Sequence, residues 1–418
     1  MGSMIHLAVG RLEIDWGKNY GFTDHSALFQ PTDLALVPYY YVKDDGRTYT
    51  DSSGEERYEL FTEYKEGMSK PLGQVVDRIE LLGHTLHQCK QEFKLLSEFN
   101  DFDESRFTFE ELSRALGSVD INAISADYGE TGEDFGKFFR RQMFGRLGLS
   151  AIAKDPDYAR DYASEAMENL SAYSILRLLA LNPKAHDLPV TWQFADVEMG
   201  GWADRWQFVR SLDKSNRFLI VTEGSSDAKV IQHALKLLKP HIADFFDFVD
   251  MEEGYPFSGT GNLFRFLQGL ISISIQNNVV VIFDNDAEGV ANFERSRSLS
   301  VPANMHILKL PDSPDFIEFA TIGPGGCHKA NINGRAAAIE CYLDLGFQPL
   351  VRWTSFNSRA DAYQGELLNK TDYVREFLNQ RERVEGYNYG RIEGVLEMII
   401  GSCVQMREAM LDSERNEI

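Results

Sequence analysis

An apolar run at residues 279–283 ends in two aspartates, Asp284 and Asp286, and this feature limits most strongly what the chain can fold into. A short continuous run of β-branched and apolar residues predicts a strand that is buried on both faces. In an extended segment, residues i and i+2 point to the same side, so both carboxylates are expected to face one point. Two like charges held that close are unfavourable unless a cation or a proton lies between them.

A second apolar run, residues 218–222, ends in Glu223, and Asp227 follows about one helical turn later. The carboxyl ends of neighbouring parallel strands lie at the same edge of a sheet, where ligands bind. Three acids from two strand ends, with Asp227 as a candidate fourth, form a set of hard oxygen ligands. Such a set suits Mg²⁺ or Mn²⁺, and we expect a metal site at this edge.

The pattern of apolar residues divides the chain into three regions. Residues 4–210 are expected to form an α-rich N-terminal domain with a mixed, partly strand-like beginning. From residue 216 to residue 312, four strands alternate with three helices, which predicts a parallel four-stranded α/β domain of βαβαβαβ order. Residues 313–418 are expected to form a mostly helical extension that completes this region.

The composition predicts a protein of two or three domains without a membrane segment. The chain has 418 residues, of which 43% are hydrophobic, and this is enough for a large core. No signal peptide or apolar run of spanning length is found, which predicts a cytoplasmic protein with no membrane partner. The four cysteines form no C-x-x-C pair, which argues against a zinc ribbon and against a disulfide framework.

The formal net charge of −22 has to be reconciled with any nucleic-acid substrate. A protein that holds phosphates is expected to carry a basic face. Three explanations stay open: the basic residues gather locally, a metal or a partner supplies positive charge, or nucleic acid is not the substrate. One basic cluster in the first half is either a phosphate-facing stripe or an ordinary helix surface; it consists of Lys137, Arg140, Arg141 and Arg146.

Glu223-Gly224 at one strand end and Asp284-x-Asp286 at another, in this order of strands and helices, resemble the Toprim domain. This domain is the catalytic unit of topoisomerases, bacterial primases and OLD-family nucleases. The chain is much shorter than a topoisomerase, and it lacks the zinc-binding cysteines of primases and the P-loop of OLD nucleases.

The sequence is most similar to the standalone HEPN/Toprim proteins, which are associated with bacterial anti-phage defence. These proteins join an α-rich N-terminal domain to an OLD-like Toprim nuclease domain. Further motifs carry the similarity: Ile322-Gly323-Pro324-Gly325, Asn333-Gly334, Ala338-Ile339-Glu340 with Tyr342-Leu343, and Tyr363-Gln364-Gly365-Glu366 with Asn369-Lys370.

The resemblance implies an enzyme that uses Mg²⁺ or Mn²⁺, as two ions, to hydrolyse phosphodiester bonds. DNA is the favoured substrate and RNA the less favoured one. The resemblance also implies catalytic roles for three of the acids, which would hold the first ion: Glu223, Asp284 and Asp286.

The remaining site candidates are two acids and two lysines. Asp227 and Glu340 would hold the second ion, although Glu340 fits an ordinary acid of an amphipathic helix equally well. A lysine is expected to neutralise the charge that develops on the phosphate, and the candidates are Lys309 and Lys370.

Two alternative functions stay open. Arg78 and His84 match the short Arg-x₄₋₆-His signature of HEPN ribonucleases, but Gly83 weakens a helix beside the histidine, so we expect a structural role for this pair. The second alternative is a regulatory protein that binds metal or nucleotide without cleaving. A partner protein or a homo-oligomer is compatible with either function.

Overall fold

The chain divides into two compact units, Met1–Leu212 and Asp213–Ile418. The computed structural model describes residues 2–43, 46–50, 56–123, 153–167, 169–249, 260–358 and 361–416. The cluster of Lys137, Arg140, Arg141 and Arg146 lies outside these residues. In the described part of the chain, no helix is both long enough and apolar enough to span a membrane.

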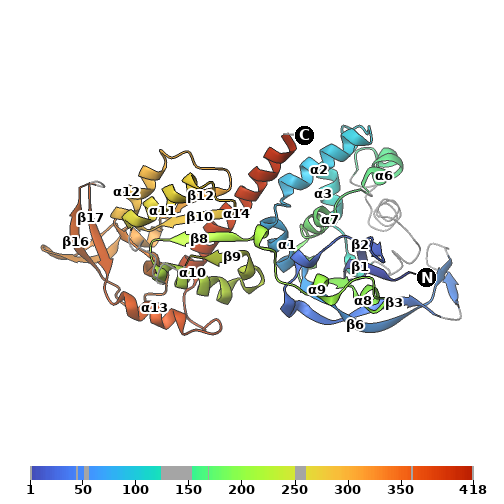
Figure 1. Ribbon diagram of the computed structural model, residues 1–418, viewed down its shortest axis with the longest axis horizontal. Coiled ribbons are helices and arrows are strands. Elements are labelled where there is room, and N and C mark those ends of the chain that lie inside the picture. Colours follow the sequence, from blue (N-terminus) through green and yellow to red (C-terminus); the bar gives the residue numbers. More distant parts are fainter. Residues whose placement is uncertain are drawn as a thin grey trace. The chain divides into compact units, whose positions relative to one another are not determined.

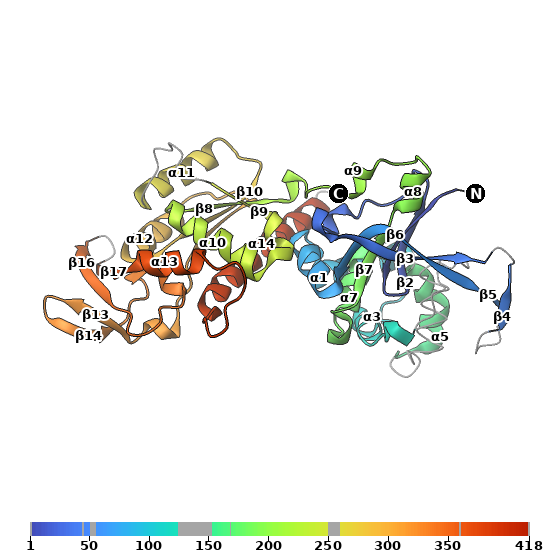
Figure 2. The ribbon, with the colours of Figure 1, turned by 90° about the horizontal axis from the view of Figure 1, so that it is seen from below.

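The first unit is built on a five-stranded antiparallel sheet with the order β2-β1-β7-β6-β3. A separate two-stranded ribbon joins β4 to β5. The strands are β1 (Met4–Val9), β2 (Leu12–Lys18), β3 (Leu34–Val42), β4 (Thr48–Thr50), β5 (Glu56–Tyr58), β6 (Leu60–Pro71) and β7 (Pro189–Gln193). Figure 2 shows helices on both sides of the large sheet, with α8 and α9 on one side and α1, α3 and α7 on the other.

The helices of this unit are short. They are α1 (Leu72–Leu81), α2 (Leu86–Phe99), α3 (Phe109–Leu116), α5 (Pro156–Tyr158), α6 (Ser164–Met167), α7 (Ala172–Leu179), α8 (Ala195–Met199) and α9 (Arg205–Phe208). Gly83 separates α1 from α2 with a φ of 101°, a conformation that favours glycine. The main core of the unit lies between the sheet and the helices, around the fully buried Trp192.

The prediction of an α-rich N-terminal region is therefore only half right, because the sheet is as large a part of this unit as the helices. The first half of β6, from Leu60 to Glu66, is mostly exposed and alternates poorly, so it gives little strand signal. Its hydrogen bonds with β3 and β7 hold it in the sheet. Pro38 lies in β3, which is an edge strand as proline requires.

The second unit begins with the parallel four-stranded sheet that the sequence predicts, in the order β12-β10-β8-β9. The strands are β8 (Phe218–Thr222), β9 (Phe246–Phe248), β10 (Asn278–Phe283) and β12 (Met305–Lys309), and the connecting helices are α10 (Ser225–Leu238), α11 (Thr260–Ser272) and α12 (Ala287–Ser296). Figure 1 shows β8 and β10 side by side within this unit. Val279, Val281 and Phe283 pack with α11 on one face of the sheet. Helices α10 and α14 (Gly390–Asn416) contact β8 and β10, respectively.

The prediction of a mostly helical extension after residue 312 is wrong, because this part is mixed. It contains a four-stranded sheet of order β14-β13-β16-β17, made of β13 (Phe319–Gly323), β14 (Gly326–Ala330), β16 (Val351–Asn357) and β17 (Ala362–Leu367). The short strand β15 (Ala336–Ala337) pairs with β11 (Asn285–Asp286) and so attaches this part to the end of the parallel sheet. Helix α13 (Lys370–Leu378) follows β17.

Gly289, in the first turn of α12, lets this helix lie directly against the end of β10. A Cβ atom at this position would lie 2.3 Å from the backbone oxygen of Asp284 and 3.0 Å from its nitrogen. Backbone atoms cannot yield as a flexible side chain can, so any larger residue would push the helix away from the strand end.

We expect Gly289→Ala to lower the free energy of unfolding by about 1–3 kcal/mol, the usual cost of overpacking. The matched control is Gly269→Ala in α11, where an added Cβ meets no heavy atom within 4 Å. That change should raise the free energy of unfolding by up to about 1 kcal/mol, because alanine favours a helix over glycine. Urea unfolding of the three proteins checks this; equal midpoints for the two variants would contradict the close approach.

Candidate metal-dependent active site

The carboxyl ends of β8 and β10 adjoin a cavity of about 830 Å³ that contains acids from four segments of the second unit. Four of the five predicted metal ligands and one of the two candidate lysines line it: Asp227, Asp284, Asp286, Glu340 and Lys370. The cavity also contains side chains for which the sequence predicts no role, among them Thr354, Gln364, Glu366 and Arg375.

Asp284 and Glu223 are linked across the two central strands. Glu223 follows β8 and is only 9% exposed. Its Oε1 accepts a hydrogen bond of 3.0 Å from the backbone N–H of Asp284, which follows β10. No described residue donates a hydrogen bond to the carboxylate of Asp284, so its oxygens remain available to a ligand in the cavity.

Asp286 and Asp227 each lie in or next to the first turn of a helix. Asp286 is the N-cap of α12, and its Oδ1 accepts a bond of 2.7 Å from Gly289 N–H. Asp227 lies in the first turn of α10, and its Oδ2 accepts a bond of 2.9 Å from Gly224 N–H. The partial positive charge of a helix N-terminus stabilises carboxylates there, which helps to keep acids close together.

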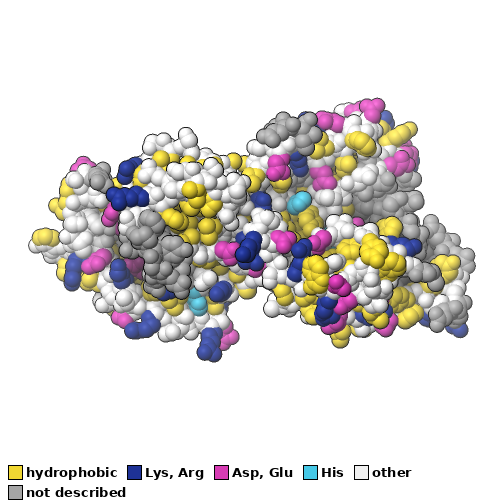
Figure 3. All heavy atoms as spheres, in the orientation of Figure 1, with side chains coloured by type: hydrophobic (Ala, Val, Ile, Leu, Met, Phe, Trp, Pro, Cys, Tyr) yellow, Lys and Arg dark blue, Asp and Glu magenta, His cyan; other side chains and the backbone are white. Residues whose placement is uncertain are grey.

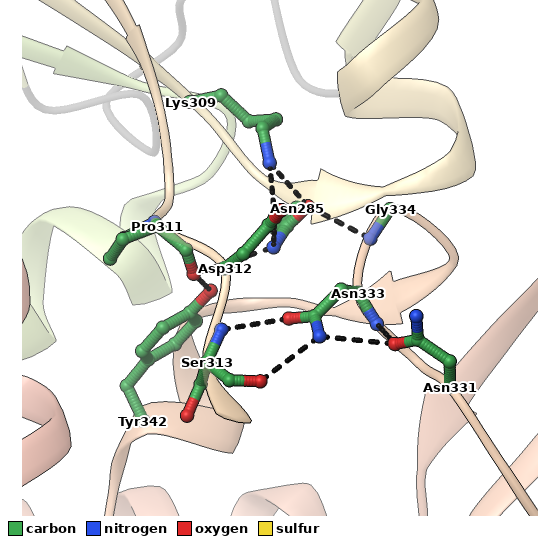
Figure 4. Close-up of polar contacts among 9 residues, drawn as sticks. All are labelled: Asn285, Lys309, Pro311, Asp312, Ser313, Asn331, Asn333, Gly334 and Tyr342. Atoms are coloured by element: carbon green, nitrogen blue, oxygen red, sulfur yellow. Dashed lines mark hydrogen bonds and ion pairs between the residues drawn. The ribbon is translucent and has the colours of Figure 1, made fainter. Parts of the chain in front are cut away.

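Asn285, between the two aspartates, is fully buried and fixes this segment from the side away from the cavity (Figure 4). Its Oδ1 accepts bonds from Lys309 Nζ at 2.7 Å and from Gly334 N–H at 2.8 Å. Its Nδ2 donates to Asp312 Oδ1 at 2.9 Å. Asp284 and Asp286 are consequently held in a register that points both into the cavity.

The same network gives Lys309 a structural environment. Its Nζ also lies 2.8 Å from Asp312 Oδ1, and Lys309 is absent from the residues that line the cavity. Asn333 extends the network through a bond from Ser313 N–H to its Oδ1 at 2.9 Å (Figure 4). The Asn333-Gly334 motif therefore supports the strand end that carries the aspartates.

Lys370 lies at the acids themselves. Its Nζ is 3.8 Å from Glu340 Oε1, and its side chain is about half exposed. Glu340 belongs to a 3₁₀ turn, Ile339–Tyr342, and is itself buried. The predicted helix over residues 335–343 does not form, because β15 occupies its first part.

Burial raises the pKa of every acid in this cavity. For Asp227, burial and then the charge of Glu340 raise the pKa to about 7. Burial, followed by Asp227 and Glu223, raises the pKa of Asp284 well above its usual range. Burial also raises the pKa of Asp286 and of Glu340. Lys370 acts in the opposite direction on Asp227, Asp286 and Glu340, which makes it a partial counter-charge for the cluster.

Gln364 is a residue of this site that the sequence does not mark as functional. Its Oε1 accepts a bond of 3.1 Å from Glu288 N–H, and its Nε2 donates to Asp286 Oδ2. It lies on β17, far along the chain from the acids, so only the pairing of distant strands brings it there. The repeated motif Tyr363-Gln364-Gly365-Glu366 is the one signal in the sequence that points to it.

The residues present suit Mg²⁺ or Mn²⁺ by their chemistry. Among the described residues, no three His, Cys, Asp or Glu side chains form a complete metal-binding group. The donors near the cavity are nevertheless all carboxylate oxygens, the ligands that hard divalent cations prefer. Their raised pKa values show that the cluster needs positive charge or protons, and a divalent ion would supply the charge.

The alternative HEPN pair does not form an active site in the structure. Arg78 is fully buried and donates to the backbone oxygens of Ala27 and Phe29, at 3.0 and 3.1 Å. The His84 ring packs edge-on against Tyr173 with ring centres 4.8 Å apart. Arg78 therefore holds a loop in the core of its unit, where a substrate phosphate would have to displace these bonds.

The raised carboxyl pKa values predict how stability depends on pH. A carboxyl whose pKa is raised by folding contributes most stability below its unfolded pKa of about 4, and this is lost as pH rises through the folded pKa. We expect Asp284→Asn to raise the melting temperature of metal-free protein at pH 8 and to have little effect near pH 4. Mn²⁺ should stabilise the parent chain more than the variant. Thermal melts in EDTA and in Mn²⁺ measure both effects.

Asp312→Asn is the matched control for this measurement. Lys309 lowers the pKa of Asp312, so the control should leave the melting temperature unchanged or lower it at pH 8. An Asp284→Asn variant that melts below the parent at both pH values would show that Asp284 is a structural acid and not part of a repulsive cluster.

Comparison with known proteins identifies the first unit. The family model described as HEPN/Toprim N-terminal domain 1 matches residues 1–216, which is more than half of the chain. No curated protein and no solved structure matches the chain. The family match favours a nuclease-like function in coarse terms, and it leaves the substrate and the metal to be proposed. The chain belongs to the HEPN/Toprim family.

Proposed function

We propose that the second unit is a Toprim-type nuclease that hydrolyses phosphodiester bonds of DNA with Mg²⁺ or Mn²⁺. The observation that carries this proposal is the convergence of Asp227, Asp284, Asp286, Glu340 and Lys370 on one cavity at the carboxyl ends of parallel strands. Ligands of parallel α/β sheets bind at that edge. A protein that binds nucleotide only would not need so many acids at one point.

The acids divide into two groups that would each hold one ion. Glu223, Asp284 and Asp286 would hold the first, and Asp227 with Glu340 the second. When bound, such ions polarise the scissile phosphate and lower the pKa of an attacking water. The DNA preference over RNA rests on the resemblance to Toprim nucleases.

The chain itself contributes fixed ligands and a positive charge. The bonds from Asp284 N–H to Glu223 and from Gly289 N–H to Asp286 hold both carboxylates before substrate arrives. Such preorganisation removes a reorganisation cost from the reaction. Lys370 is the lysine placed to donate a hydrogen bond to a phosphate oxygen, whereas Lys309 is engaged in the network around Asn285.

Metal ions and Lys370 also reconcile the acidic composition with a phosphate substrate. The net charge of −22 would repel DNA from most of the surface. Arg375 and Lys370 both line the cavity, so positive side chains are present where the phosphate would approach. A role in anti-phage defence, in which cleavage is restrained until it is triggered, is part of the same proposal and rests on the family resemblance.

We expect purified protein to cleave DNA with Mn²⁺, to be inactive in EDTA and to need no ATP. Glu223→Ala should lower the rate by about 100-fold or more, because metal affinity depends strongly on each group that supports the ions. Glu294→Ala, which removes an exposed acid of α12, is the matched control and should change nothing. Release of acid-soluble nucleotides measures the rate.

His84→Ala separates the two possible sites of this chain. It should leave cleavage unchanged, because Arg78 is held in the core and the pair does not form a site. If His84→Ala abolishes RNA cleavage while Glu223→Ala has no effect, the ribonuclease hypothesis is correct and the proposed function is wrong.

A further inference from the structure

A second, smaller cavity lies beside the acidic one. It measures about 340 Å³ and is lined by residues of α12 and of β16 and β17, with Phe356 and Asn292 among them. Gln364 lines both cavities. This shared side chain bonds to Asp286 on the acidic side, so the smaller cavity is adjacent to the proposed catalytic acids.

Two exposed aromatic rings stand at this cavity. Phe356 on β16 pairs directly with Tyr363 on β17, and the rings meet edge to face with centres 5.3 Å apart. Phe356 is 53% exposed and Tyr363 is 60% exposed. Figure 3 shows hydrophobic side chains at the surface over these two strands. Exposed aromatic rings next to a polar cavity form a surface on which another flat ring can stack.

The charges of the two cavities differ. The acidic cavity contains the cations Lys370 and Arg375. None of the described residues that line the smaller cavity is positively charged, and one, Glu288, is an exposed acid. The others are mostly neutral hydrogen-bonding residues, which include Asn292, Ser355 and Asn357. A phosphate is therefore disfavoured there, and a neutral ring with hydrogen-bonding edges is favoured.

We propose that Phe356, Tyr363 and the cavity beside them form a stacking subsite for one unpaired base of a nucleic-acid strand. This inference rests on the proposed nuclease function and specifies its substrate as single-stranded. The base would stack on Phe356 while the neighbouring phosphate enters the acidic cavity on the other side of Gln364.

An unpaired base is required because a paired base cannot reach these rings. In a duplex, each base is stacked between its neighbours, and extruding it costs several kcal/mol. A single strand offers its bases at little cost, and stacking on an aromatic side chain stabilises the complex for any base. The subsite therefore predicts a preference for single strands without a strong preference for sequence.

The test measures binding separately from cleavage. The Asp284→Asn chain, in Mn²⁺, is titrated with a 12-nucleotide single-stranded DNA that contains one 2-aminopurine, whose fluorescence falls when it stacks. We expect Phe356→Ala, added to this chain, to weaken binding at least about fivefold and to abolish the quenching, since one stacked base supplies that much. Phe347→Ala removes a more exposed aromatic outside both cavities and should change neither.

Three further arms define the ligand. A blunt duplex of the same sequence should bind equally to the parent and to Phe356→Ala, and a DNA with abasic positions should lose the advantage of the single strand. RNA of the same sequence shows whether the subsite accepts bases from both nucleic acids. Melting temperatures of the variants should match the parent, because both rings are mostly exposed.

The outcomes separate the two proposals. If the unmodified chain cleaves DNA with Mn²⁺ but Phe356→Ala and Tyr363→Ala bind single strands as tightly as the parent, the subsite is refuted and the nuclease function stands. Equal losses for duplex and single strand, or tight binding of abasic DNA, also refute it. If the chain neither cleaves nor binds DNA, both proposals fail, and the exposed rings belong to an interface with another protein.

Discussion

The proposed site depends on the side chain of Asn285, which is buried between two aspartates that face the cavity. Its amide receives bonds from Lys309 and Gly334 and donates to Asp312, so three separate segments hold one residue. Successive side chains of an extended segment point in opposite directions, and fixing Asn285 on one side therefore fixes its two neighbours on the other. Without this anchor, repulsion between Asp284 and Asp286 would turn the strand end toward solvent.

The parallel sheet and its acids were predictable because both depend on local patterns. Residues 279–283 form a buried strand as their composition requires, and Glu223 follows the neighbouring strand. Strand order in an α/β unit is then restricted by the handedness of its crossovers. The positions of Asp227, Asp284 and Asp286 at one cavity follow from this local information alone.

The features that the sequence does not reveal depend on distant pairing. Lys309 and Lys370 are equivalent by composition, but Asn285 and Asp312 engage the first while α13 starts with the second beside Glu340. Gln364 reaches Asp286 only because β17 pairs with β16 and lies against β15. In the first unit, the exposed half of β6 has no hydrophobic alternation, so hydrogen bonding with β3 decides its structure.

Asp286 belongs to a helix and to the cavity at the same time. Its Oδ1 caps α12 through Gly289 N–H, so any ligand that draws electron density from this carboxylate weakens the cap by the same interaction. The first turn of α12 thus becomes a reporter of what occupies the acids. Hydrogen exchange of a single backbone amide, several residues from the phosphate, would register arrival and departure of the ion without any measurement of cleavage.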